Sequence, residues 1–424
     1  MLRKQFRFPF LIVFALMLCL FLPVMNLHSA IIFVVNSESR TLSKIDTNTN
    51  QVQNAFTQLG LIPNKVIVGE NYLWSVNSGD NAIQKINLQT GATIANILVE
   101  TGCNPWDACL NENFLYVTGL FTNKVYKIDT TSNSMVDFVN VGVCPEALCV
   151  YNGKLYVTNT GGYQNNYANS SVSVIDLSSF QVIQTIPVSA NPQYIEEHNG
   201  LLHVSCTGNW TNVSGNVCVI NPVTNEVIQT IAIGGSLGNI WINPDHQALV
   251  GDANGYNLYR YSAANYDILN DSANPLTPGG SVVWGDDELI ALLYPNWGFN
   301  GKVKILHPDL SYWKEYTVAL APTDMKFLPA VTAIDDEYQT PAVKVSVYPN
   351  PARSGQDITF KFQDGILGIL KIYNTKGQLV YTSSANTNQF TIKASTFSQK
   401  QPSGFYLYKF QSDKGSVQGK LIIL

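Results

Sequence analysis

The sequence predicts an all-β protein: a seven-bladed β-propeller, closed by a blade to which both ends of the propeller contribute, followed by a small antiparallel β-sandwich. Three observations indicate this fold class. A short strand pattern recurs seven times at nearly constant spacing, hardly any segment has the periodicity of a helix, and residues 345–424 alternate with period two in a different manner.

Residues 1–30 have the features of a signal peptide. Three basic residues precede a mostly apolar run from Phe8 to Met25, and the small pair Ser29–Ala30 follows. Two prolines interrupt the run, which is short for a membrane-spanning helix of about 20 apolar residues. We therefore expect cleavage near Ala30 and no membrane span in the mature chain.

The recurring strand pattern defines a propeller predicted over residues 31–329. Its clearest copy is Lys154–Asn159, with the sequence KLYVTN. Neighbouring copies lie 40 to 47 residues apart when they are aligned at their last residues, Asn36, Asn77, Gly119, Asn159, Cys206, Asp252 and Tyr294. A self-similar β unit with a period of about 40–50 residues is typical of a propeller blade.

Each repeat is expected to form four strands. In the fourth repeat the second strand is Leu155–Thr158, the third is Val172–Asp176 and the fourth is Val182–Val188, and Pro192–Glu196 begins the next unit. Asn152–Gly153 favours a two-residue hairpin turn, because Asn and Gly accept positive φ. The polar residues that end the third strands are expected to form Asx turns rather than to act in catalysis: Asp46, Asn87, Asp129, Asp176 and Asn221.

The two ends of the repeat region are predicted to share one blade. The chain enters at Ile32 on a strand of the second type and leaves on residues 322–328, a strand of the first type. We expect residues 322–328 to be the innermost strand of the blade whose outer three strands come from residues 31–57. This arrangement closes the ring and leaves no open sheet edges between its ends.

The pattern L-Y-V-T-N, followed by I-D-x-x-T and then by a small residue and Pro before the next strand, resembles the YVTN-repeat family of seven-bladed propellers. Surface-layer and corrinoid-binding-like propellers are of this kind. The resemblance covers about residues 31–329 and implies the fold. Since family members have varied functions, it implies little about chemistry.

Residues 330–344 are expected to be a polar linker and residues 345–424 a second domain. A small antiparallel sandwich is predicted by four stretches of period-two alternation, Val347–Ala352, Leu370–Val380, Ser403–Tyr408 and Gly419–Leu424. In this order they resemble the type A sorting domain of type IX secretion substrates. The resemblance implies that the type IX machinery carries the protein across the outer membrane, to the medium or to an anchored position on the cell surface.

Composition and motifs narrow the function further. Charged residues make up 13% of the chain, against a typical 25% or so, and the net charge is −5. No basic patch is interleaved with aromatic residues, so nucleic acid is not an expected partner. The sequence contains no G-x-S-x-G, H-E-x-x-H or zinc-type C-x-x-C motif, and its histidines lie at unrelated repeat positions.

Six cysteines follow the signal peptide, an even number in an oxidising compartment. Cys206 and Cys218 bracket one long loop between a second and a third strand, where hairpin geometry can bring two cysteines within disulfide distance. They are a candidate disulfide, with free thiols as the alternative. Cys109 and Cys149, at equivalent positions of adjacent inner strands, are expected to be small apolar residues with free thiols.

Long loops are predicted on one face of the propeller, which we call the upper face. The loops before first strands and those between second and third strands emerge there, and they carry six aromatic residues, Tyr163, Tyr167, Trp210, Tyr256, Trp297 and Phe299. Aromatic side chains on polar loops favour ligand binding, because they offer rigid contact area at small entropic cost. The alternative is that these side chains pack on their own loops.

The starts of the inner strands are expected to point towards the ring axis at the upper face. They bring together a mixed set of charges, amides and aromatic rings: Lys65, Trp106, Asp107, Glu146, Gln193, Tyr194, Asn239 and Asp324. Such a mouth fits a polar ligand with flat faces, such as a glycan or a corrin-like cofactor. The alternative is a water-filled channel.

The sequence therefore predicts a secreted or cell-surface, non-enzymatic binding propeller without a resident cofactor. It would capture a glycan, a corrinoid-like cofactor or a protein on its upper face. The competing hypothesis is a propeller hydrolase or lyase whose metal is held through oxygen ligands by Asp107, Glu146, Asn239 and Asp324. A third is a scaffold for adhesion through protein contacts on the same face.

Overall fold

The structure is a computed structural model that describes residues 30–328 except 297, and residues 345–424 except 363–367, 375–377, 386–388, 399 and 413–414. The chain divides into two compact units, Met1–Val331 and Thr332–Leu424. The expected signal peptide, apart from Ala30, and the expected linker 330–344 lie outside the described residues.

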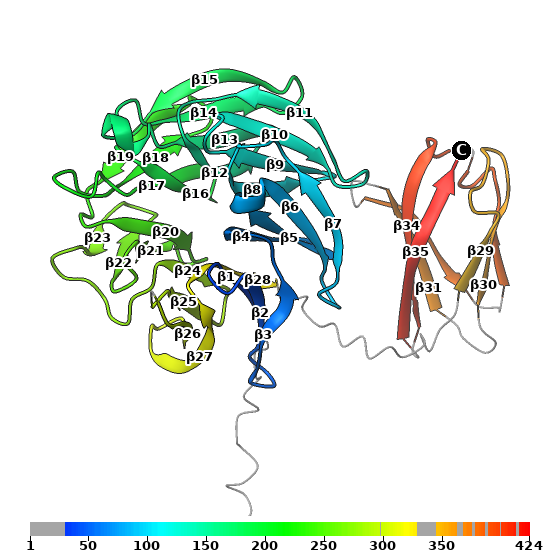
Figure 1. The fold of residues 1–424 in the computed structure, drawn as a ribbon. Helices are drawn as coiled ribbons and strands as arrows, with labels where there is room; N and C mark the ends of the chain where they lie inside the picture. Colours follow the sequence, from blue (N-terminus) through cyan, green and yellow to red (C-terminus); the bar gives the residue numbers. More distant parts are fainter. Residues whose placement is uncertain are drawn as a thin grey trace, which may run out of the picture. The chain divides into compact units, whose positions relative to one another are not determined.

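The described part of the first unit consists of seven antiparallel four-stranded sheets, the blades (Figure 1). In order from the innermost strand outwards, blade 1 contains β28 (Pro322–Leu328), β1 (Ile31–Asn36), β2 (Thr41–Asp46) and β3 (Gln51–Gln58). Blade 2 contains β4 (Pro63–Val68), β5 (Tyr72–Asn77), β6 (Ala82–Asn87) and β7 (Thr93–Leu98). Blade 3 contains β8 (Pro105–Asn111), β9 (Phe114–Gly119), β10 (Lys124–Asp129) and β11 (Ser134–Asn140).

The next four blades follow the same order. Blade 4 contains β12 (Pro145–Tyr151), β13 (Lys154–Asn159), β14 (Ser171–Asp176) and β15 (Gln181–Pro187). Blade 5 contains β16 (Pro192–His198), β17 (Leu201–Cys206), β18 (Asn216–Asn221) and β19 (Glu226–Ile231). Blade 6 contains β20 (Leu237–Ile242), β21 (Gln247–Asp252), β22 (Leu258–Ser262) and β23 (Ile268–Asn270), and blade 7 contains β24 (Val282–Gly285), β25 (Ile290–Tyr294), β26 (Asn300–Leu306) and β27 (Tyr312–Leu320).

The seven copies of the repeat pattern are the second strands of the blades. Each is almost wholly buried, as in β13, where only Lys154 is partly exposed. Both faces of such a strand pack against a neighbouring blade, which is why the pattern is apolar at consecutive positions rather than alternating. The core accordingly lies in clusters between adjacent blades; one of them joins Tyr116 and Val125 of blade 3 to Leu155 and Val157 of blade 4.

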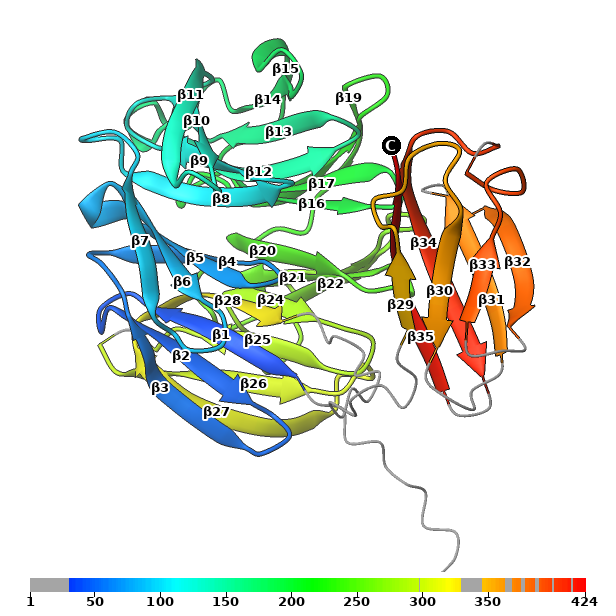
Figure 2. The same ribbon diagram turned by 90° about the vertical axis from the view of Figure 1, so that its right-hand side faces the viewer.

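The shared blade is confirmed. β28 pairs antiparallel with β1, and Val34 lies opposite Met325, with both side chains fully buried. Figure 2 shows β28 between β1 and β24. The innermost strands contact one another in the cyclic order β4, β8, β12, β16, β20, β24, β28 and again β4, so the ring is closed through the strand that arrives last in the chain.

The predicted turn chemistry is also observed. Asn152 and Gly153 have φ values of 46° and 72°, as a two-residue hairpin turn of the mirror-image type requires. Asp46 Oδ1 accepts hydrogen bonds from the backbone N–H groups of Asn48 and Thr49, at 2.9 and 3.1 Å. The equivalent residues Asn87, Asp129, Asp176 and Asn221 cap their own turns in the same way.

The second unit is a small antiparallel sandwich. One sheet contains β29 (Val345–Tyr348), β30 (Ile358–Phe362) and β33 (Gln389–Ile392). The other has the order β32 (Leu379–Ala385), β31 (Gly368–Asn374), β34 (Gly404–Ser412) and β35 (Gly415–Ile423). Their inward side chains form one core, in which the rings of Phe360 and Tyr408 meet edge to face at 5.2 Å.

Candidate functional site

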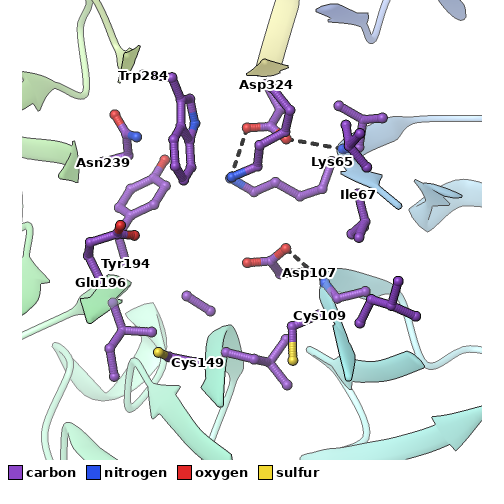
Figure 3. A pocket seen from close by; sticks show the side chains of 18 of the residues that line it. Lys65, Ile67, Asp107, Cys109, Cys149, Tyr194, Glu196, Asn239, Trp284 and Asp324 are labelled. Carbon is purple, nitrogen blue, oxygen red and sulfur yellow. Dashed lines mark hydrogen bonds and ion pairs between the residues drawn. The ribbon is translucent and has the colours of Figure 1, made fainter. Parts of the chain in front are cut away.

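A cavity of about 510 Å³ lies on the ring axis and is lined by the innermost strand of every blade. We call it the axial cavity; Figure 3 shows labelled side chains from several strands pointing into it. Since successive residues of a strand point to opposite sides, residues two apart face the cavity together. Tyr194 and Glu196 on β16 are one such pair, and Asp324 and Lys326 on β28 are another.

Lys65 is held in place by two neighbours near the mouth of the axial cavity. Its Nζ lies 3.8 Å from Oδ1 of Asp324 and 4.8 Å from the centre of the Tyr194 ring. Burial by itself lowers the pKa of Lys65, but the surrounding acidic groups, Asp324 foremost, outweigh burial and raise that pKa. Lys65 therefore remains charged and offsets the Asp324 carboxylate.

Two of the predicted mouth residues join neighbouring blades. Asp324 Oδ2 accepts a hydrogen bond from the backbone N–H of Val66 at 3.1 Å, which ties β28 to β4. The Asn239 amide donates to the carbonyl of Val283 at 2.8 Å and accepts from its N–H at 2.6 Å, which ties β20 to β24. These hydrogen bonds join neighbouring blades. Because both the N–H and the oxygen of the Asn239 amide are used in this way, it has little hydrogen-bonding capacity left for a ligand.

Three residues deeper in the axial cavity were missed by the sequence analysis: Glu196, Trp284 and Lys326. Lys326 Nζ lies 3.3 Å from the centre of the Trp284 ring. Burial raises the pKa of Glu196 to about 7 and lowers the pKa of Lys326. The two-residue period of a β-strand could have predicted them, because alternate residues of a strand face the same side. Glu196 follows Tyr194, Trp284 follows Val282 and Lys326 follows Asp324, each by two residues.

The remaining wall of the axial cavity is less polar. Asp107 projects into the cavity, where its Oδ1 accepts only the N–H of Ala108, at 2.7 Å, and burial raises its pKa. Cys109 and Cys149 line the same side, and burial raises both thiol pKa values, that of Cys149 to about 12. Both are free thiols, as expected.

A second cavity, of about 480 Å³, opens on the upper face between blades 3 and 4. We call it the upper groove. Its rim carries two largely exposed rings, Phe121 on the β9–β10 loop (67% exposed) and Tyr163 on the β13–β14 loop (75% exposed). Four amide side chains also line it: Asn123, Gln164, Asn165 and Gln193.

One wall of the upper groove continues into blade 5 through two aromatic residues. The indole N–H of Trp210 donates to the Tyr167 hydroxyl at 3.1 Å, and Asn209 Nδ2 donates to Asn166 Oδ1, also at 3.1 Å. Tyr167 and Trp210 have φ values of 58° and 65°, which are strained for bulky side chains. The loops of blades 4 and 5 are therefore tied to each other.

Glu146 lines the upper groove rather than the axial cavity, and its side chain is buried. Burial raises its pKa to about 8, against the opposing effects of the Lys65 charge and a hydrogen bond with Trp106. Gln193 Oε1 accepts a hydrogen bond from Thr207 Oγ1 at 3.0 Å. The predicted mouth residues are thus divided: Lys65, Asp107, Tyr194, Asn239 and Asp324 line the axial cavity, Glu146 and Gln193 line the upper groove, and Trp106 lines neither. Of the predicted loop aromatics, Tyr163 and Tyr167 line the upper groove.

Two of the predicted loop aromatics that the structure describes, Tyr256 and Phe299, lie outside both cavities, and Trp210 is joined to the upper groove only through Tyr167. Tyr256 is exposed and meets the ring of Tyr294 edge to face, at 5.8 Å between ring centres, outside both cavities. Trp297 lies outside the described residues. The exposed Phe299 on the same loop as Trp297 also lines neither cavity.

The predicted disulfide is wrong: Cys206 and Cys218 are free thiols. Across the β17–β18 pair Cys218 lies opposite Val204, and Cys206 lies opposite Asn216, so the two cysteines are diagonal neighbours. Diagonal neighbours are about 7–8 Å apart, beyond the usual Cα separation of a disulfide, about 4.4–6.8 Å. The Cys206 thiol instead donates to the carbonyl of Val204 at 3.8 Å, and the Cys218 thiol donates to the Ser189 hydroxyl at 3.3 Å. The neighbouring Cys206 thiol, together with Ser189, lowers the pKa of Cys218 to about 6.

The carboxylates that the competing hypothesis assigned to a metal ion lie in two different cavities. Asp107 and Asp324 face the axial cavity, whereas Glu146 lines the upper groove. In the part of the chain that the structure describes, no group of three or more His, Cys, Asp or Glu side chains is placed to hold a metal ion.

No described helix has the length and apolarity needed to cross a membrane.

Residues 346–424 match the family model of the secretion system C-terminal sorting domain. This match confirms the resemblance to type IX sorting domains that the alternating strands indicated. The chain is therefore exported by that system to the extracellular medium or the cell surface. No curated protein matches the chain.

Several solved structures are similar to this chain at low sequence identity. A functionally unknown protein from Desulfotomaculum acetoxidans is 12% identical, covers 70% of this chain and 98% of its own, and has a TM-score of 0.56. Apo AztD from Citrobacter koseri is 11% identical over 71% of this chain and 98% of its own, with a TM-score of 0.49. Hydrazine synthase from Kuenenia stuttgartiensis is 15% identical over 60% of this chain and 85% of its own, with a TM-score of 0.47.

Proposed function

We propose that the exported propeller is a non-enzymatic binding protein that captures a glycan in the upper groove. The observation that carries this proposal is a pair of exposed aromatic rings, Phe121 and Tyr163, over a groove lined by amide side chains. Flat rings pack against the apolar faces of sugar rings, and amides both donate and accept hydrogen bonds, as sugar hydroxyls require.

The backbone of the upper groove supports a binding role. Positive φ at a bulky residue costs roughly 1–3 kcal/mol and persists only where the surroundings hold it in place. Tyr167 and Trp210 both have positive φ, and the hydrogen bond between their side chains fixes one wall of the groove before any ligand arrives. A wall ordered in advance loses less conformational entropy on binding.

A corrinoid-like cofactor or a protein would use the same exposed rings, so the test compares ligand classes directly. The purified secreted protein is screened on a glycan array and titrated calorimetrically with cobinamide and cyanocobalamin. We expect binding to one set of related glycans. If corrinoids alone bind, or if neither class binds and the only partner recovered is a protein, the proposed glycan is wrong.

Substitutions of the aromatic rings test whether the glycan binds in the upper groove. Replacing either groove ring, Phe121→Ala or Tyr163→Ala, should weaken glycan binding by about tenfold or more, because each removes a rigid contact surface. Phe299→Ala is the matched control, since Phe299 is 68% exposed, like Phe121 at 67%, but lies outside the groove. Equal losses in all three variants, or none, would place the ligand elsewhere.

A further inference from the structure

We propose that the axial cavity binds a free α-amino acid with an apolar side chain, with Lys326 receiving its carboxylate and Glu196 and Asp107 its ammonium group. This site is separate from the upper groove and does not depend on the function proposed for it. The inference comes from the charges that line the cavity and from the position of its apolar wall.

The charges of the axial cavity are only partly paired. Lys65 and Asp324 form an ion pair at 3.8 Å. Among the described residues, Lys326, Asp107 and Glu196 have no ion-pair partner, and Glu196 accepts no hydrogen bond. Lys326 and the two carboxyl groups act on one another only at distances beyond that of an ion pair, so a ligand of mixed charge would complete their compensation.

The cation and the carboxyl groups come from different blades. Lys326 projects from β28 and packs against the Trp284 ring, whereas Glu196 projects from β16 and Asp107 from β8. A ligand with a single charge would satisfy one side and leave the other uncompensated. A zwitterion satisfies both, because its carboxylate accepts from the Lys326 ammonium group and its own ammonium donates to the carboxylates.

The wall formed by β4, β8 and β12 decides what kind of zwitterion fits. It presents Ile67, Cys109, Ala147 and Cys149, and the charged Lys65 and Asp107 lie two residues before Ile67 and Cys109 on the same strands. Figure 3 shows the labelled Ile67 and Cys109 across the cavity from Trp284 and Tyr194, with Cys149 between Cys109 and Glu196. An aliphatic or thioether side chain on the ligand would cover this wall and exclude water from it. This burial contributes about 25 cal/mol of favourable binding free energy for each Å² of apolar surface.

The size of the cavity agrees with such a ligand. Pockets that enclose small molecules measure roughly 300–1,000 Å³, and this one measures about 510 Å³. It is large enough for a leucine-sized amino acid together with several bridging waters, which commonly complete the hydrogen bonds of an enclosed polar site.

Binding should be linked to protons. Burial raises the pKa of Glu196 to about 7, and the other titratable groups that act on Glu196 are Lys326, Glu197, Cys149 and Tyr261. A ligand ammonium beside Glu196 favours the ionised carboxylate and so lowers that pKa. Binding near neutral pH should release protons, and affinity should increase between about pH 6 and pH 8.

The first test uses the whole secreted protein and a panel of small ligands in calorimetry. We expect L-leucine and L-methionine to bind, with a heat that depends on the ionisation enthalpy of the buffer. Isocaproate lacks the ammonium group, isoamylamine lacks the carboxylate and glycine lacks the side chain, so each should bind at least about tenfold more weakly. If leucine does not bind at millimolar concentration, or if any of the three binds as tightly, the proposal is wrong.

The second test assigns the residues. Glu196→Gln and Lys326→Met should each reduce leucine affinity by about 10- to 100-fold, and Glu196→Gln should also abolish the proton release. Lys304→Met is the control, because Lys304 also packs against a ring, 4.7 Å from the centre of Tyr294, but lies outside the cavity. Unchanged leucine affinity in both cavity variants, with melting temperatures like that of the control, would overturn the assignment. The ligand panel still decides the question if a variant does not fold.

Discussion

At the scale of single residues, the centre of the propeller holds carboxyl groups whose ionised form is disfavoured. Burial raises the pKa values of Asp107, Glu146 and Glu196 above their ordinary range. The nearby cations Lys65 and Lys326 only partly offset this effect. Such groups are expected where a ligand, rather than the protein itself, completes the charge balance.

The free energy of unfolding of a Glu146 variant tests whether burial disfavours the ionised carboxyl group. Its pKa is about 8 in the folded protein and near the ordinary 4.5 in the unfolded chain, so the folded state binds the extra proton between these values. Stability of the wild type therefore falls as pH rises from about 4.5 to 8. Glu146→Gln keeps the acceptor for Trp106 and should raise the free energy of unfolding by about 2–4 kcal/mol at pH 9 and by almost nothing at pH 4.

The measurement is denaturant unfolding of both proteins at several pH values. Glu226→Gln, at an exposed position, serves as the control and should show no such pH-dependent gain. A gain that is constant across the pH range would show that the carboxyl of Glu146 is not the cause.

At the scale of the element, the last residue of the repeated strand connects it to the third strand of the same blade. Asn159 Nδ2 donates to the hydroxyls of Ser173 and Ser171, at 3.0 and 3.2 Å, and the side chain is fully buried. Asn36 makes the corresponding bond to Ser43 Oγ at 2.8 Å. The polar end of an otherwise apolar strand is thus part of the packing within a blade rather than of a ligand site.

Asn159→Ala should lower the free energy of unfolding by about 1–3 kcal/mol, because it leaves two buried hydroxyls without their donor. Asn48→Ala, in an exposed turn, should change it by less than about 0.5 kcal/mol. Chemical denaturation measures both. If the two substitutions cost the same, the buried hydrogen bonds of Asn159 contribute nothing to the blade.

At the scale of the whole molecule, the propeller is complete at β28, and the sorting domain has a core of its own. β28 supplies the inner strand of blade 1, and with it the Met325 side chain and the Lys65–Asp324 pair. In the sorting domain β35 is an edge strand that covers β34 and buries Leu421 and Ile423. Folding and export should therefore be separable.

Three truncations test this separation. A chain that ends at 344 should fold as a propeller but remain in the periplasm, because it keeps β28 and lacks the sorting domain. A chain that ends at 418 should also fail to be secreted, because the loss of residues 419–424 exposes the edge of β34. A chain that ends at 321 should not fold, because β1 loses its inner partner β28 and the ring is left open.

Circular dichroism of periplasmic extracts and immunoblots of the medium measure folding and export. If the chain ending at 344 reached the medium as efficiently as the full chain, or if it were unfolded, the two-unit organisation would be wrong. Normal secretion of the chain ending at 418 would remove the role assigned to β35.

The sequence by itself determined the seven blades, the closing strand, the turns and the sorting domain. These follow from short-range rules: a repeat spacing, the φ preferences of residues such as Asn152 and Gly153, and the alternation of apolar residues. Such signals lie within one repeat, and recurrence confirms each of them several times.

Only the tertiary structure decided how side chains from different blades meet. It placed Glu146 in the upper groove rather than on the axis, committed Asn239 to the backbone of Val283, and brought Lys326 and Glu196 into one cavity. It also set Cys206 and Cys218 on a diagonal that a disulfide does not span. These outcomes depend on differences of a few ångströms between residues far apart in the chain, and a repeat spacing carries no information at that distance scale.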